Sequence, residues 1–104
     1  YLVITRPDVI EAIHSSFLEA GADVLETDTF RSNRLTLGEY GLGERVREIA
    51  IAAAQLARRA ADRFSTPEKR RFVAGSIGPS GFLPSASDPT LGNITFDELV
   101  PLFA

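Results

Sequence analysis

The fold of this chain is decided by the stretch Gly21-Ala22-Asp23-Val24-Leu25-Glu26-Thr27-Asp28-Thr29-Phe30, which changes character halfway along. Its first half is a glycine helix stop followed by a short apolar run, which is typical of a strand buried on both faces of a parallel sheet. Its second half, Glu26 to Thr29, carries four polar side chains where the strand ends. Because ligand crevices in α/β folds lie at this end of the strands, the stretch predicts a site-forming strand. The alternative is that Glu26 to Thr29 only begin a solvated loop.

Composition places the chain among ordinary folded proteins. It has 104 residues, 44% of them hydrophobic and 24% charged, so it is one domain or less. The net charge is −3 and the basic residues are scattered apart from Arg58-Arg59 and Lys69-Arg70-Arg71. We interpret the second of these clusters, Lys69-Arg70-Arg71, as a solvated turn before a strand. We therefore expect no nucleic-acid partner.

Several other kinds of protein are excluded by simple counts. The chain has no cysteine, so disulfides and thiolate metal ligands are excluded within it. No apolar run approaches the roughly 18 residues of a membrane helix, and the start lacks the order of a signal peptide. We expect no membrane partner and a cytoplasmic location.

A helix is predicted before the deciding strand, over about residues 6–20. Thr5 is a candidate cap, Pro7 suits the first turn, and Asp8 stands three residues after the cap. An apolar stripe at helical spacing is predicted to face the core, made of Ile10, Ile13, Phe17 and Ala20. His14, the only histidine, borders this stripe, and we expect a surface or flank role for it rather than catalysis.

A second strand is predicted to lie beside the first. Residues 31–43 are expected to be a loop or a short helical stretch, and the pattern over 42–64 predicts a long amphipathic helix. A strand over about 71–77 follows, so the order is βαβ, which is right-handed and places the strands parallel. Residues 26–29 and 76–79 should therefore lie on one edge of the sheet.

The rest of the sequence predicts a loop and one more helix. Gly75, Gly78 and Gly81 allow close backbone approach, but they do not fit a dinucleotide-binding fingerprint. Residues 80–94 are long enough for a lid or pocket rim. Thr95 to Glu98 predict a capping box, and Pro101 is expected to kink or end the helix that follows.

Two parallel strands cannot bury both faces of a sheet by themselves, so further strands are required. The pattern alone fits either an open doubly wound sheet or a (β/α)₈ barrel, which takes roughly 250 residues. The first residue is not methionine and the last ones lie in a predicted helix, so we expect truncation at both ends.

Four motifs in register carry a resemblance to a known family. They are Thr5-Arg6-Pro7-Asp8-Val9-Ile10, the Gly21 to Phe30 stretch, Gly75-Ser76-Ile77-Gly78-Pro79 and Asn93-Ile94-Thr95-Phe96-Asp97-Glu98-Leu99. Together they resemble the homocysteine-binding module of the cobalamin-dependent methionine synthases, with the wider homocysteine S-methyltransferase family, which uses other methyl donors, as the nearest rival. The resemblance implies that residues 1–104 are part of a homocysteine-binding (β/α)₈ TIM barrel and supply its second and third strands with their flanking helices.

The resemblance also implies a reaction. The full-length enzyme would bind homocysteine, activate its thiol on zinc as a thiolate nucleophile, and transfer a methyl group to give methionine. Its zinc ligands would be cysteines in later strands, and cobalamin and methyltetrahydrofolate would serve domains outside this chain. No catalytic residue or metal ligand is assigned within residues 1–104. The residues expected to line the pocket for the polar end of the amino acid are Thr27, Asp28, Thr29, Ser76, Gly78 and Pro79.

One position departs from the family pattern. The first strand end commonly reads Glu-Thr-Asn-Thr-Phe, and Asp28 replaces the asparagine. An ionised carboxylate accepts a hydrogen bond from an ammonium group but cannot donate to a carboxylate. The alternative hypothesis is a non-catalytic barrel fragment. The isolated chain is expected to be inactive, poorly stable or self-associating, and to bind neither zinc nor homocysteine appreciably.

Overall fold

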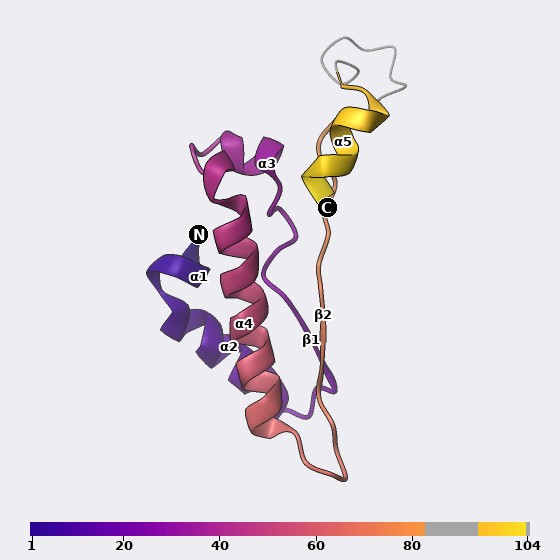
Figure 1. Ribbon diagram of the computed structural model, residues 1–104. Helices are drawn as coiled ribbons and strands as arrows, with labels where there is room; N and C mark the ends of the chain where they lie inside the picture. The colour runs from indigo at the N-terminus through magenta and orange to yellow at the C-terminus, as the bar shows by residue number, and fades with distance from the viewer. Residues whose placement is uncertain (83–93, 104) are drawn as a thin grey trace. The chain divides into compact units, whose positions relative to one another are not determined.

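The computed structural model describes residues 1–82 and 94–103. Figure 1 shows the elements in chain order: α1 (Leu2–Thr5), α2 (Pro7–Glu19), β1 (Val24–Glu26), α3 (Arg34–Gly38), the 3₁₀ turn η1 (Gly43–Arg45), α4 (Val46–Phe64), β2 (Phe72–Ala74) and α5 (Phe96–Phe103). The predicted rim over residues 80–94 lies mostly outside the described residues. The chain divides into two compact units, residues 1–29 with 47–76 and residues 30–46 with 77–104.

The first unit is built on the predicted βαβ arrangement. β1 and β2 pair in parallel with Val24 opposite Phe72 and Glu26 opposite Ala74, and α4 is the crossover between them (Figure 1). The strands are three residues each, shorter than the predicted spans. Backbone bonding extends the ladder only to Asp23 at one end and Thr27 at the other.

The core of this unit lies where the two long helices meet the strands. It contains Leu18 from α2, Leu25 from β1, and Ala60 and Ala61 from α4, with Phe64 and Val73 packed against it. The predicted apolar face of α4 is confirmed, because its buried residues are Ile49, Ala53, Leu56, Ala57, Ala60 and Ala61. Burying a side chain such as Leu25 stabilises a fold by about 1.5–3 kcal/mol.

Both helices cover the same face of the strand pair. Side chains alternate along a strand, so Val24 and Phe72 lie on the face opposite Leu25 and Val73. Within the described residues these two apolar side chains are 54% and 53% exposed. The uncovered face is therefore apolar rather than polar.

The predicted core stripe of α2 is wrong in part. Ile10, His14 and Leu18 are buried, whereas Ile13 and Phe17 are 46% and 60% exposed among the described residues and Ala20 is exposed as well. Positions spaced by three and four fit two overlapping stripes on one helix. Contact with the core at Leu18 selects the stripe that steps by four.

The start of α2 also differs from the prediction. Thr5 is itself helical, as the last residue of α1, so the position before α2 is Arg6 and no side chain caps the helix. Pro7 occupies the first position as predicted. Asp8 pairs with Arg6 at 2.8 Å, and this hydrogen bond lowers the pKa of the Asp8 carboxyl.

The end of α2 follows the prediction at Gly21. This glycine has φ +105°, a left-handed conformation that favours glycine. The amide of Ala22 bonds the Phe17 carbonyl at 3.0 Å, and that of Gly21 bonds Leu18 at 3.0 Å. This pair of bonds is a Schellman motif, which satisfies carbonyls that a helix end leaves without partners.

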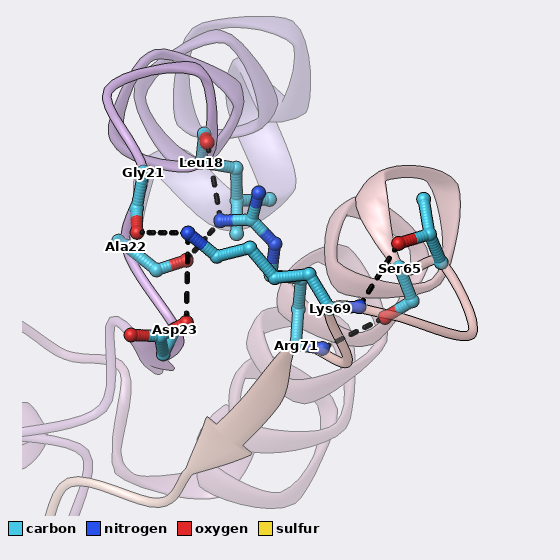
Figure 2. A network of polar contacts seen from close by, with 8 residues as sticks. Leu18, Gly21, Ala22, Asp23, Ser65, Lys69 and Arg71 are labelled. Atoms are coloured by element: carbon cyan, nitrogen blue, oxygen red, sulfur yellow. Dashed lines mark hydrogen bonds and ion pairs between the residues drawn. The ribbon is translucent and has the colours of Figure 1, made fainter.

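Arg71 ties β2 to the end of α2, at the edge where the strands begin. We call residues 21–23 and 69–71 the amino edge. The Arg71 guanidinium donates to the Leu18 carbonyl at 3.2 Å and to the Ala22 carbonyl (Figure 2). Cations are favourable at a helix C-terminus because the exposed carbonyls carry partial negative charge.

Lys69 adds a second cation to the amino edge. Its ammonium donates to the Gly21 carbonyl at 2.9 Å and lies 3.7 Å from the Asp23 carboxylate (Figure 2). The interpretation of Lys69 to Arg71 as a solvated turn is therefore wrong for Arg71, which is half-buried and structural. Arg70 is exposed, as expected for a turn.

The second unit contains the shorter helices. Asn33 caps α3 by accepting a hydrogen bond from the Thr36 amide at 2.9 Å. The predicted capping box is confirmed, since Thr95 donates to Glu98 at 2.7 Å and the Glu98 amide donates to the Thr95 hydroxyl at 3.2 Å. This bonding lowers the pKa of Glu98.

Pro101 was predicted to kink or end the helix, and it does not end it, because α5 continues to Phe103. A proline removes one backbone hydrogen bond, but its ring holds φ near helical values. Among the described residues, no helix combines the length and the apolar character needed to cross a membrane.

Candidate functional site

Hydroxyl groups join the two strands at the edge where they end. We call Glu26–Thr29 with Ser76 the carboxyl edge. The Ser76 amide donates to Thr27 Oγ1 at 3.0 Å, the Thr27 and Thr29 hydroxyls are 2.7 Å apart, and Thr29 Oγ1 donates to the Ser76 carbonyl at 2.7 Å. Both backbone groups of Ser76 are therefore bonded to threonine side chains.

The direction of this relay follows from the count of protons. A threonine hydroxyl has one proton to donate. Thr29 gives its proton to the Ser76 carbonyl, so the bond between the two hydroxyls must be donated by Thr27. Thr27 and Ser76 are buried and Thr29 is half-buried, which shields the relay from exchange with water.

The two carboxylates of the carboxyl edge, Glu26 and Asp28, lie on the face of the strand opposite Leu25 and Thr27. Burial alternates from residue 24 to residue 28, so Glu26 and Asp28 are exposed while Leu25 and Thr27 are buried. Glu26 accepts a hydrogen bond from the Ser76 hydroxyl. Asp28 makes no hydrogen bond or ion pair with any described residue, and it occupies the middle of a tight turn closed by the Thr29 amide on the Thr27 carbonyl at 2.9 Å.

His14 is buried, which corrects the prediction of a surface or flank position. It is 6% exposed, and its Nε2 has no hydrogen-bond partner among the described residues. Burial lowers the pKa of His14 from 6.5, and the negative charge of Asp28 acts in the opposite direction. The imidazole is therefore disposed to be neutral near pH 7.

The two remaining predicted site residues belong to the second unit. Gly78 is buried, and a Cβ at this position would overlap the carbonyl oxygen of Phe30 and approach its carbon to 2.9 Å. Pro79 is exposed. The close backbone approach explains why a glycine is needed at position 78.

The described residues do not fit a metal centre. Over residues 1–82 and 94–103 no three His, Asp or Glu side chains gather where they could hold an ion. Glu26 and Asp28 offer oxygen ligands alone, which suit zinc poorly when a thiol is to be activated.

The structure thus brings together Thr27, Thr29 and Ser76, and beside them lies Asp28, whose carboxylate has no partner over residues 1–82 and 94–103. The bond between Ser76 and Glu26 was not predicted. It depends on the parallel register with Glu26 opposite Ala74, which places residue 76 just beyond Glu26 and which the sequence does not specify.

Known proteins resemble this chain along most of its length. The model of the family described as Homocysteine S-methyltransferase matches residues 1–104. "Methionine synthase" of Mycobacterium tuberculosis (strain ATCC 25618 / H37Rv) is 46% identical over 92 residues, which are 88% of this chain and 7% of that protein. "Methionine synthase" of Mycobacterium leprae (strain TN) gives the same identity and coverage.

This chain therefore spans about 7% of the length of the curated relatives that it matches. A family match over all 104 residues, together with this identity to two methionine synthases, is decisive for family membership. The chain belongs to the homocysteine S-methyltransferase family.

Proposed function

We propose that residues 1–104 are part of a homocysteine-binding (β/α)₈ barrel and that the carboxyl edge takes the polar end of homocysteine. The family match supports the barrel, as does the strand pair with helices on one face and an exposed apolar face opposite. Barrel strands have their helices outside and their inward side chains packed together.

The proposed reaction is transfer of a methyl group to the sulfur of homocysteine, which gives methionine. The relatives named methionine synthase support this reaction. Zinc, cobalamin and methyltetrahydrofolate belong to the full-length enzyme in this proposal, with ligands and domains beyond these residues, and the proposed location is the cytoplasm. The described residues would bind and orient the substrate.

The observation that carries the proposal is the unpaired, exposed carboxylate of Asp28 at the end of a parallel strand. Homocysteine carries an ammonium group at neutral pH, and a carboxylate accepts a charge-assisted hydrogen bond from it. Thr27, Asp28, Thr29 and Ser76 build the edge in this proposal. Gly78 and Pro79 stay predicted pocket residues on the sequence alone.

The test is calorimetric titration of homocysteine into the natural polypeptide that carries these residues. Losing a hydrogen bond between charged groups costs about 1.5–3 kcal/mol, so Asp28→Ala should weaken binding roughly tenfold to a hundredfold. Asp23→Ala, a change at the other end of the same strand, is the matched control and should leave affinity unchanged. Equal affinity of Asp28→Ala and the unaltered protein would contradict the assignment.

The second candidate is a non-catalytic member of the family that keeps the fold. The resemblance to the family pattern Glu-Thr-Asn-Thr-Phe favours it, because Asp28 stands where that pattern has asparagine and the amide's hydrogen-bond donor is lost. Methyl transfer by Asp28→Asn but not by the unaltered protein would support this candidate.

A further inference from the structure

We propose that Thr27, Thr29 and Ser76 are positioning residues, whose hydroxyl relay continues the parallel ladder past β1 and fixes the turn that carries Asp28. On this proposal the carboxyl edge recognises the ammonium group of its ligand and not its carboxylate. The inference rests on the proposed function for its ligand. The relay itself rests on geometry alone.

The pattern of bonds is that of a parallel ladder with two partners replaced. In such a ladder one residue donates its amide to the carbonyl of residue i−1 opposite and accepts at its carbonyl from the amide of residue i+1. The bonds from Phe72 to Asp23 and from Thr27 to Ala74 follow this scheme. The next rung would join the Ser76 amide to the Thr27 carbonyl, and the Thr29 amide to the Ser76 carbonyl.

Side-chain oxygens make this rung instead of backbone groups. The Ser76 amide meets Thr27 Oγ1, and the Ser76 carbonyl meets Thr29 Oγ1. The two backbone groups that are released, the Thr29 amide and the Thr27 carbonyl, bond each other at 2.9 Å. The chain can therefore turn at Asp28 while no backbone group of the rung loses its partner.

The same bonds use every hydroxyl proton at the carboxyl edge. Thr27 donates to Thr29, Thr29 donates to the Ser76 carbonyl, and the Ser76 hydroxyl donates to Glu26. Among the side chains of this edge, the groups left for a ligand are the carboxylate oxygens of Asp28 and Glu26, which are acceptors. A ligand that presents N–H donors fits this edge, and one that presents a carboxylate does not.

Double-mutant cycles separate positioning from direct contact. Thr29→Val removes the hydroxyl at constant shape, and we expect homocysteine affinity to fall about threefold to tenfold, with Thr29→Ser close to the unaltered protein. In an Asp28→Ala background the same change should alter affinity by less than about twofold, because Thr29 acts through Asp28. An equal loss in both backgrounds would mean that Thr29 contacts the ligand itself.

Ligand analogues test which end is recognised. Against homocysteine, 4-mercaptobutanoate lacks the ammonium group and 3-aminopropanethiol lacks the carboxylate. Asp28→Ala should weaken binding of homocysteine and 3-aminopropanethiol by similar factors and leave 4-mercaptobutanoate unchanged. The opposite order, with 4-mercaptobutanoate most affected, would overturn recognition of the ammonium group.

The relay can also be tested in the absence of ligand, by hydrogen exchange at the Ser76 amide. Hydrogen–deuterium exchange by NMR should show that the Ser76 amide is protected, that Thr27→Val speeds its exchange at least tenfold, and that Thr27→Ser restores protection. Unchanged protection in Thr27→Val would overturn the relay. If the unaltered protein does not bind homocysteine, the proposed function fails, and the exchange data still decide the relay.

Discussion

The amino edge and the carboxyl edge of the strand pair use different kinds of side chain to bond the backbone. At the amino edge, Lys69 and Arg71 place positive charge on backbone carbonyls at the end of α2. At the carboxyl edge, neutral hydroxyls bond the backbone and each other, and the carboxylates form no ion pair with any described residue. Charged side chains bond the backbone at the amino edge, whereas at the carboxyl edge this is done by neutral hydroxyls.

The largest loss of stability is expected from a substitution at Gly78, which follows the carboxyl edge in the chain. Gly78→Ala would drive a methyl group into the Phe30 carbonyl, a backbone atom that cannot move aside. We expect a loss of about 3 kcal/mol in the free energy of unfolding, at the upper end of overpacking effects. The measurement is urea unfolding of the natural polypeptide.

Gly75→Ala is the matched control for this change. A Cβ on Gly75 meets no described atom within 4 Å, and its φ is not positive. Its effect should be near zero or slightly stabilising, because alanine reduces the freedom of the unfolded chain. Comparable losses for the two substitutions would contradict the close approach at Phe30.

A smaller loss of stability is expected from a substitution at the amino edge. Arg71→Met keeps much of the apolar stem and removes the donors to Leu18 and Ala22. The half-buried Ala22 carbonyl loses its partner, whereas the Leu18 carbonyl keeps the Gly21 amide, and the change should cost about 2 kcal/mol. Arg70→Met changes an exposed cation next to it and should cost less than about 0.5 kcal/mol. Homocysteine affinity should be equal in both variants, and a selective loss in Arg71→Met would break the separation of roles between the edges.

The smallest expected change is in the pH dependence of stability, through the protonation of His14. Burial lowers its pKa below 6.5, so below about pH 6.5 the unfolded chain binds a proton that the folded chain does not. The stability is fully present above pH 6.5 and falls as the pH drops toward the lowered folded pKa. The nearby charge of Asp28 opposes the shift and keeps the effect modest.

His14→Gln should flatten this dependence. Urea unfolding between pH 7.5 and 5.5 compares the slopes of stability against pH in the two proteins, above the range in which ordinary carboxyl groups titrate. Equal slopes would show that His14 is not held neutral by its surroundings.

The order of elements was predictable because periodicity and handedness are local or general properties. The apolar repeat gave the span and face of α4, and the βαβ rule gave the parallel pairing of β1 with β2. The choice between two stripes on α2 was not predictable, because it depends on contact at Leu18 with residues distant in sequence.

The carboxyl edge was predictable in position but not in its bonding. The sequence identifies Glu26 to Thr29 as polar residues at a strand end, but their side chains do not all lie on one face of the strand. The alternation of a strand continues to Asp28, so Thr27 is buried while Glu26 and Asp28 are exposed. The relay to Ser76 depends on the register between β1 and β2, which cannot be determined from the sequence of either strand alone.

The alanines of α4 have a consequence for how this sequence can change over time. Ala60 and Ala61 are fully buried against Leu18 and Leu25, and alanine has no rotamers. The separation between the helix and the strands is therefore set by backbone and Cβ atoms, so a larger side chain would move the strands themselves. We therefore expect these two positions to accept only the smallest residues, whereas an exposed neighbour such as Arg59 should accept many.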